Sequence, residues 1–557
     1  MKRGTLLITI VALCVLGNAA CGGGHHHVIP PPPATQNFTF YASGEDIVEE
    51  GDTYSIAGVV SITADGTVTA GEQDYNDGDG ATSPQPSGDT ITGGSLVLNP
   101  DGSGNAVLTL NTNNVALGEG GTETFAVSFP NTNHALITQF DGSATSSGSF
   151  DLQTSVALPT GAFSFVASGT DPDFASVADG GIFTVTAGAI AGTVDVNDGG
   201  NFTLNTAFTG ALGTPDSFGR GTITNDENFP TAFNYYVVGP ECIRIIDVDA
   251  EDTAVGSAYG HGDSEGSFSN ASIGQSVFSI GASLDTDFYS GAGQFNTDAG
   301  GAAKPKSKSK THSATPEGVV DVNTFNGVGD ISELDEVLDI AVPISGTYTL
   351  GGDGYGSMAF AAGFGDVGAF GVYAVDPTLN IQDPNNASDG GGALVAEMDG
   401  NLVGTGSIVP QTDITVASFD GSYAFGAQGN TDIDFDEFDF LGTATMDSTS
   451  GDFAGVGFLG DPFAAFDVAV LSDTVSFAAT AVPDETNPGR YTTTLALTGP
   501  DLPGELDLDF SIYQASGGQL FWVNLDGEEG VEAGGSLQQF PGSGTDAKKA
   551  KLNNKKH

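Results

Sequence analysis

The chain has 557 residues and a formal net charge of −57 at pH 7, because it carries 71 acidic residues and only 14 basic ones. Such a surface repels phosphate backbones, which excludes nucleic acid as a partner. Apolar residues make up 39% of the chain and 82 residues are glycine, so we expect several packed domains with many tight turns and little helix.

The first 20 residues have the pattern of a secretory signal peptide. Two basic residues precede an apolar core over 5–16, and small residues come directly before Cys21. This core is shorter than the roughly 20 apolar residues of a transmembrane helix. We therefore expect the chain to be exported and the signal to be removed.

The segment Asn-Ala-Ala-Cys at 18–21, followed by three glycines, resembles the lipobox of bacterial lipoproteins, with Asn18 where that family usually has an aliphatic residue. The resemblance implies that Cys21 is acylated and holds the protein on a membrane through its lipid. Gly22 stands where an aspartate would favour inner-membrane retention, so the outer membrane or the cell surface is the expected location. Cleavage without acylation, giving a periplasmic or secreted protein, is the alternative. Residues 21–36 would then form a tether, flexible at its glycines and stiff at its prolines.

One β unit repeats four times along the rest of the chain. FSFVASG at 163–169 matches FTFYASG at 38–44, and short alternating runs separated by Asp-Gly turns follow. The predicted β repeats span 37–152, 160–275, 276–412 and 413–540. About eight strands per unit, in an antiparallel meander, can close and remove both sheet edges. The predicted fold class is all-β, with tandem meander domains that form small up-and-down barrels or sandwiches. The array resembles tandem Gly/Asp-rich β-repeat lipoproteins of bacteria, which implies no particular activity.

Three segments depart from this repeat. Residues 300–318 hold four lysines and no apolar periodicity, which predicts a disordered loop within repeat three. Residues 541–557 are also basic and are expected to be a disordered tail. Residues 331–340 place Ile331, Leu334 and Leu338 at helical spacing and form the one predicted helix.

Acidic turns in repeats one and two are candidate calcium sites. Carboxylate and amide oxygens two residues apart on a tight loop suit Ca²⁺, which takes about six to eight oxygen ligands. The candidate ligands are Asp74, Asn76 and Asp79 in repeat one and Asp195, Asn197 and Asp198 in repeat two. Neither cluster has the spacing of an EF-hand, and Asp, Asn and Gly are also ordinary turn residues, so purely structural turns are the alternative.

Two enzyme-like motifs lack the context that their chemistry needs. Residues 262–266 read G-x-S-x-G and residues 363–368 read G-x-G-x-x-G, but neither is followed by a predicted helix. No catalytic residue is assigned. The recurrent strand-end acids are interpreted as turn caps; they are Asp141, Asp247, Asp399 and Asp526. The acidic strand at 432–440 is interpreted as a solvated face over an apolar one.

These observations favour a lipid-anchored envelope protein that binds or spaces other molecules without catalysis. A calcium-stabilised adhesin or a glycan-binding module is the alternative, and a hydrolase is the least supported class. Beside the membrane, an envelope polymer or a glycan is the expected partner. Trp522, Tyr513, Tyr235 and Tyr236 are candidates for sugar stacking, although their apolar strands favour a place in the core.

Overall fold

The computed structural model describes residues 35–540 except for residues 47–51, 79–88, 116, 172–174, 230, 249–251, 285–286, 299–322, 335–338, 362–363, 366, 387–389, 413, 432–436, 462–469, 501, 503 and 527–530. The predicted signal peptide, Cys21, the Lys-rich segment 300–318 and the basic segment 541–557 lie outside the described residues. Within these residues, no helix is long and apolar enough to cross a membrane.

The described chain folds into four antiparallel β-barrels, which confirms the all-β prediction and its barrel form. Barrel 1 consists of β1 (Gln36–Asp46), β2 (Asp52–Ile62), β3 (Thr67–Asn76), β4 (Asp89–Leu98), β5 (Asn105–Thr112), β6 (Thr122–Ser128), β7 (His134–Gln139) and β8 (Ala144–Leu152). Barrel 2 consists of β9 (Gly161–Thr170), β10 (Ser176–Thr186), β11 (Ala189–Asp198), β12 (Asn201–Leu212), β13 (Arg220–Asn225), β14 (Phe233–Gly239), β15 (Cys242–Asp247) and β16 (Thr253–Gly260). In both barrels each strand pairs with its sequence neighbours, and the last strand pairs with the first.

The other two barrels follow the same plan. Barrel 3 consists of β17 (Ser276–Leu284), β18 (Asp287–Thr297), β19 (Asn323–Glu333), β20 (Asp339–Leu350), β21 (Tyr355–Phe360), β22 (Ala369–Ala374), β23 (Ala393–Glu397) and β24 (Val403–Pro410). Barrel 4 consists of β25 (Gly421–Thr431), β26 (Glu437–Met446), β27 (Asp452–Asp461), β28 (Val470–Thr480), β29 (Val482–Pro483), β30 (Arg490–Thr498), β31 (Leu506–Gln514), β32 (Gln519–Asn524) and β33 (Val531–Gln539). Barrel 4 is a nine-stranded sheet that closes through the pairing of β28 with β30.

The helices in the described part of the chain are four short 3₁₀ turns, η1 (Gly262–Ser264), η2 (Asn270–Ser272), η3 (Val416–Phe419) and η4 (Ser516–Gly518). The helix predicted at 331–340 is wrong at both of its ends, because 331–333 belong to β19 and 339–340 belong to β20. Ile331 and Leu334 are buried in barrel 3. Two apolar residues three apart satisfy a helix pattern, but here strand pairing with β18 decides the conformation.

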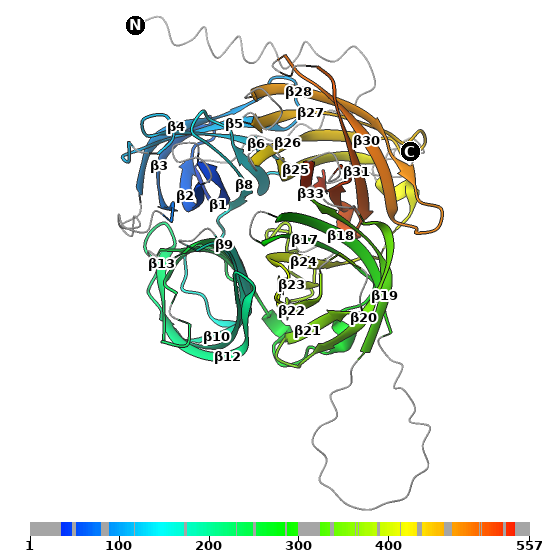
Figure 1. Cartoon of the computed structure of the whole chain (residues 1–557). Helices are drawn as coiled ribbons and strands as arrows, with labels where there is room; N and C mark the ends of the chain where they lie inside the picture. Colours follow the sequence, from blue (N-terminus) through cyan, green and yellow to red (C-terminus); the bar gives the residue numbers. More distant parts are fainter. Residues whose placement is uncertain are drawn as a thin grey trace, which may run out of the picture.

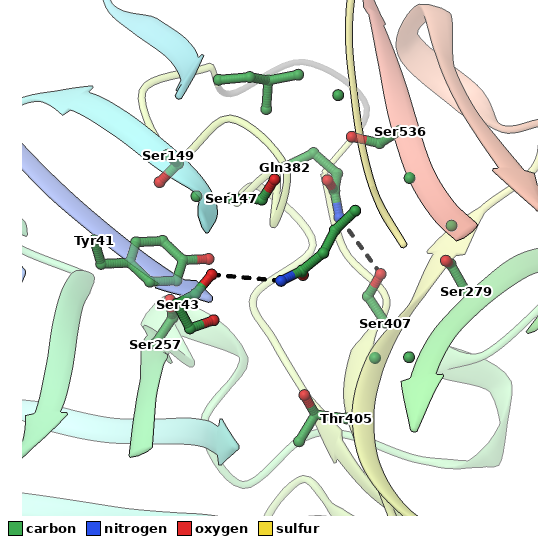
Figure 2. A pocket seen from close by; sticks show the side chains of 18 of the residues that line it. Tyr41, Ser43, Ser147, Ser149, Ser257, Ser279, Gln382, Thr405, Ser407 and Ser536 are labelled. Atoms are coloured by element: carbon green, nitrogen blue, oxygen red, sulfur yellow. Dashed lines mark hydrogen bonds between the residues drawn. The ribbon is translucent and has the colours of Figure 1, made fainter. Parts of the chain in front are cut away.

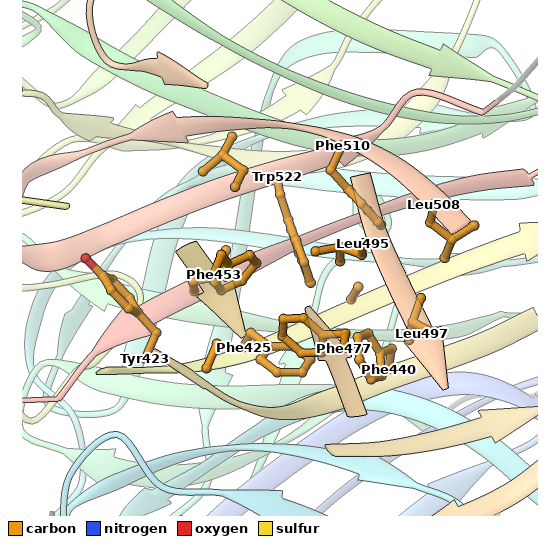
Figure 3. Packing of buried hydrophobic residues seen from close by; sticks show 14 of the residues in the cluster. Tyr423, Phe425, Phe440, Phe453, Phe477, Leu495, Leu497, Leu508, Phe510 and Trp522 are labelled. Carbon is orange, nitrogen blue, oxygen red and sulfur yellow. The ribbon is translucent and has the colours of Figure 1, made fainter. Parts of the chain in front are cut away.

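Apolar residues at alternate strand positions fill each barrel, as the period of two in a strand requires. Figure 3 shows the interior of barrel 4, where Trp522 is enclosed by phenylalanines. Its indole stacks on Phe510 at 4.7 Å between ring centroids and meets Phe425 edge-on at 5.6 Å. The indole N–H donates to the Gly426 carbonyl at 3.1 Å, so this buried polar group is satisfied.

A glycine occupies the same position in all four barrel closures. Gly148, Gly256, Gly406 and Gly535 lie on the last strands and pair with Ala42, Ala167, Ile280 and Ala427 on the first strands. A Cβ added at any of these glycines would lie 1.8 to 2.1 Å from a carbonyl oxygen of the first strand. Only glycine therefore allows the first and last strands to approach this closely. A serine follows each of these glycines.

The barrels surround a common centre in chain order, so that barrel 4 returns to barrel 1 (Figure 1). The first and last strands of every barrel lie on the inner side of this ring and line its centre. The connection between β22 and β23, within residues 375–392, reaches from barrel 3 across the centre. There the Asn385 amide donates to the Asn133 and Leu152 carbonyls of barrel 1, both at 3.1 Å.

Candidate functional site

Four of the six predicted calcium ligands lie at the junctions between barrels. Both carboxylate oxygens of Asp74, near the end of β3, accept hydrogen bonds from Arg220 of barrel 2 at 2.7 Å. Tyr236 of barrel 2 also donates to Asp74, at 2.7 Å. The Asn76 amide donates to the Asp247 and Asp252 carbonyls of the same barrel, at 3.0 and 2.7 Å.

The equivalent residues of barrel 2 make the same kind of contact with barrel 3. Asp195 on β11 accepts hydrogen bonds from Tyr355 and Tyr373, both at 2.8 Å. The Asn197 amide donates to the carbonyls of Glu397, Asp399 and Leu402. Burial raises the pKa of Asp195, although its hydrogen bonds act in the opposite direction.

Three junctions share one geometry. At each junction, an aspartate on the third strand of one barrel contacts two residues of the next barrel. These two residues pair directly with each other, one on the fifth and one on the sixth barrel-forming strand. The pairs are Arg220 with Tyr236, Tyr355 with Tyr373, and Arg490 with Tyr513. The residue opposite each aspartate on the second strand is small, namely Ala57, Gly180 or Ala292. A Cβ at Gly180 would lie 2.3 Å from the Tyr373 ring, so the small residue makes room for the tyrosine.

The junction of barrel 4 with barrel 1 differs from the other three. Its buried aspartate is Asp439 on β26, which accepts hydrogen bonds from Thr145 and Ser147 of β8. Glu437 is also buried and donates its backbone N–H to Glu45 of β1 at 3.2 Å. The acids at 432, 434 and 436, which form the predicted solvated face, lie outside the described residues, so that interpretation stays a prediction. Glu437 and Asp439, which follow them, are buried against barrel 1.

Calcium binding itself stays a prediction. Asp79 lies outside the described residues, and Asp198 is exposed at the end of β11. Over the described ranges, no three His, Cys, Asp or Glu side chains gather in the arrangement of a metal site. A calcium-dependent rise in melting temperature that EDTA reverses is the result that this prediction requires.

A cavity of about 430 Å³ at the centre of the ring is a further candidate site. Figure 2 shows side chains from barrels 1 to 4 facing this space, including Ser43, Ser257, Ser407 and Ser536. The wall contains nine serines and three glutamines, together with threonines, tyrosines and the closure glycines. Because these side chains are neutral donors and acceptors, the wall suits a ligand rich in hydroxyl or amide groups.

A buried ionic network forms part of the barrel 1 and barrel 2 wall. Asp151 accepts a hydrogen bond from Nδ1 of His134 at 2.7 Å and binds Arg244 through its other oxygen. Arg244 also donates to Ser257 and to Tyr259, and its guanidinium lies 4.6 Å from the centre of the Tyr41 ring. All three members of the network are at most 2% exposed. The cavity wall is therefore held rigidly at this point.

The two pKa shifts in this network have one cause. Burial acts to raise the pKa of Asp151, but the charges of Arg244 and His134 outweigh it and lower the pKa to about 2. Burial acts to lower the pKa of His134, but Asp151 outweighs it and raises the pKa above the usual value. The network therefore favours a charged Asp151 and a protonated His134.

The remaining candidates from the sequence are structural in their contacts. Tyr236 and Tyr513 belong to junctions, whereas Tyr235 and Trp522 lie in barrel cores, and all four are buried. Asp141 and Asp399 accept hydrogen bonds from backbone N–H groups two residues later, as turn caps do. The G-x-S-x-G segment includes the 3₁₀ turn η1 and is not followed by an α-helix.

The central cavity was not predicted from the sequence, because the residues that line it are small and lie far apart along the chain. Its one sequence signal is the Gly-Ser pair that recurs on the last strand of each barrel, at 148–149, 256–257, 406–407 and 535–536. In each pair the glycine permits barrel closure and the serine lines the cavity.

Comparison with known proteins identifies no family. No family model and no curated protein matches the chain. Among solved structures, the chain is similar to a single-substitution mutant of the vaccine antigen transferrin binding protein B from Haemophilus parasuis Hp5. The identity is 10%, the coverage is 94% of this chain and 98% of that chain, and the TM-score is 0.20. A double mutant of the same antigen gives 9% identity, coverage of 93% and 97%, and a TM-score of 0.20. At these scores the likeness carries no argument about function.

Proposed function

We propose that the protein is a lipid-anchored envelope protein that binds a ligand in the central cavity of its four-barrel ring without catalysis. The cavity carries this proposal, because all four barrels contribute hydrogen-bonding side chains to one space of about 430 Å³. Pockets of roughly 300–1,000 Å³ hold small molecules. The signal sequence and Cys21 supply the argument for export and anchoring.

The cavity can be tested by filling it. Gly281 on β17 lines the cavity, and a Cβ added there would meet no atom within 4 Å. We expect Gly281→Phe to leave the melting temperature within about 2 °C and to abolish binding of sugars and polyols from a small-molecule panel, measured by calorimetry. Gly504→Phe is the matched control, because Gly504 is exposed, is also free of atoms within 4 Å and lies outside the cavity. A ligand that both variants bind as well as the unaltered protein does would contradict the proposal.

The anchor is tested separately through Cys21. We expect Cys21→Ala to move the protein from the membrane fraction into the soluble envelope fraction, because the thiol that carries the lipid is lost. Immunoblots of fractionated cells, with metabolic labelling by a fatty acid, measure this change. Equal fractionation and equal labelling of the two proteins would show that the chain is not held by acylation at Cys21.

A further inference from the structure

Among the described residues that line the central cavity, no charged side chain is open to a ligand. None of the described aspartates or glutamates lines the cavity, although the chain has 71 acidic residues. Arg244 and His134 do line it, but both are at most 2% exposed and both are bonded to Asp151. A carboxylate or an ammonium group in the cavity would therefore lose its hydration without reaching an opposite charge. Because this loss is costly, the wall disfavours charged ligands.

Three hydroxyl groups from three barrels are free for a ligand. Ser43 of β1, Ser279 of β17 and Ser536 of β33 line the cavity and are half-buried. Their hydroxyls have no hydrogen-bond partner within the described part of the chain, and each oxygen remains accessible to solvent. Figure 2 shows the three side chains facing one space, with Ser43 on one side and Ser279 and Ser536 on the other.

The pairing of the barrel strands holds these hydroxyls in place. Ser43 pairs with Ser147, and Ser279 pairs with Ser407, each time across the first and last strands of a barrel. Both partners also line the cavity. Because the hydroxyls lie on paired strands and not on loops, a ligand has little backbone to order when it binds.

An amide and apolar side chains complete the wall. Gln382, in the connection between β22 and β23, is half-buried and donates to Ser407 in a long bond of 3.4 Å. Its side-chain carbonyl oxygen has no hydrogen-bond partner within the described ranges and remains accessible to solvent. Leu136 and Val166 are half-buried apolar residues of the same wall. The cavity therefore offers hydrogen-bond donors and acceptors together with apolar contacts, which match the hydroxyls and the C–H groups of a sugar ring.

We propose that the central cavity binds a neutral sugar through Ser43, Ser279, Ser536 and Gln382, and that it excludes the acidic and amino counterparts of the same sugar. This inference rests on the proposed function and narrows the class of its ligand. A sugar hydroxyl both donates and accepts, so one ring can satisfy the serine hydroxyls and the glutamine amide together. A free sugar and the end of a neutral glycan share this chemistry.

The test compares sugars that differ in one substituent. Calorimetry with the purified protein at neutral pH uses glucose, galactose and mannose, each beside its uronic acid and its 2-amino sugar. We expect at least one neutral sugar to bind, and to bind about tenfold or more tightly than its two charged counterparts, because neither charge finds a partner in the cavity. Oligomers of this sugar that bind as well would identify a glycan end as the source of the ligand, whereas weaker oligomer binding would identify a free sugar.

Serine variants locate the bound sugar. Ser279→Ala and Ser536→Ala should each weaken its binding about three- to tenfold, because each removes one hydrogen bond to the ligand. Ser345→Ala is the matched control, since Ser345 is exposed on β20 and does not line the cavity. We expect this control to bind the sugar as the unaltered protein does.

The outcomes separate this inference from the proposed function. A charged counterpart that binds as tightly as the neutral sugar, and that Gly281→Phe excludes, would overturn the neutral preference and leave the proposed function intact. No binding by any sugar would also overturn the inference, while the polyols of the small-molecule panel would still test the proposed function. A sugar whose binding neither the serine variants nor Gly281→Phe reduces would overturn both, because it would lie outside the cavity.

Discussion

Replacement of Asp330 by alanine should destabilise the junction between barrels 3 and 4 by about 3–5 kcal/mol. Asp330 is fully buried and accepts hydrogen bonds from Nε of Arg490 at 2.7 Å and from another guanidinium nitrogen at 2.8 Å. It also accepts a bond from Tyr513. The substitution would remove this partner of Arg490, which is only 4% exposed, and leave the partly exposed Asp484 as its remaining ion-pair partner. Thermal unfolding and hydrogen exchange of β19, β30 and β31 would measure the loss.

The equivalent aspartate of another junction is the control. Asp195 binds two neutral tyrosines in place of an arginine and a tyrosine. We expect Asp195→Ala to cost only about 1–3 kcal/mol, because unpaired hydroxyls are less costly to bury than an unpaired charge. The double variant Asp330→Ala with Arg490→Met should recover part of the stability lost in Asp330→Ala. Equal losses of stability in Asp330→Ala and Asp195→Ala would show that the unpaired charge of Arg490 does not determine the cost of removing Asp330.

The barrels could be predicted from the sequence because their information is local. Alternating apolar residues, Asp-Gly turns and the recurrence of one unit are sufficient to indicate antiparallel strands that close. The prediction of a helix at 331–340 was wrong because it also used only local information. The spacing of Ile331 and Leu334 fits both a helix and a strand, and the pairing of β19 with β18 selects the strand.

The junction contacts of Asp74 and Asn76 could not be predicted from local sequence patterns. Their spacing on a tight turn resembles a calcium loop, but their partners are more than 140 residues away; the pair Asp74 and Arg220 is separated by 146 positions. One observation in the sequence does bear on these junctions. Only three arginines follow residue 3, namely Arg220, Arg244 and Arg490, and each forms an ion pair with an aspartate of a neighbouring barrel.

The central cavity is further from prediction because no barrel contains it. It forms only where the first and last strands of all four barrels come together, and each pair of strands contributes common residues such as Gly256 and Ser257. What distinguishes the cavity is the absence of acids among its described lining residues, which becomes visible only when the lining is known.

The junction of barrel 4 with barrel 1 should weaken as the pH rises. Burial raises the pKa of Asp439 to about 6, although its hydrogen bonds with Ser147, Thr145 and Glu437 act to lower it. Burial, together with the charges of Asp439 and Glu45, raises the pKa of Glu437. Among the ion pairs of the described residues, none includes Asp439 or Glu437. The other groups facing this pair are the hydroxyls of Thr145 and Ser147 and the amide of Gln428.

The sign of the effect follows from proton linkage. A carboxyl group with a raised pKa in the folded state binds its proton at a pH where the unfolded chain has released it. Its stabilising contribution is therefore complete below the unfolded pKa near 4 and is lost as the pH rises through about 6. For Asp439, a rise from 3.8 to about 6 corresponds to a loss on the order of 3 kcal/mol. Asp151, with its pKa lowered to about 2, loses its contribution only toward acid pH, outside this window.

We therefore expect Asp439→Asn to make the protein more stable than the unaltered chain at pH 8 and to reduce the fall in melting temperature between pH 4 and pH 8. Asparagine has nearly the same shape and keeps an acceptor for Thr145 or Ser147, but it cannot ionise in the buried junction. Other carboxyl groups with raised pKa values, including Glu123 and Glu532, contribute to the same fall, so the difference between the two proteins is the measured quantity. Asp65→Asn, in an exposed turn, is the control and should leave the profile unchanged over this range. Parallel melting profiles for Asp439→Asn and the unaltered protein would show that Asp439 does not titrate in this window. Hydrogen exchange locates the effect: if it increases with pH selectively in β8 and β26, and only in the unaltered protein, the loss of stability lies at this junction.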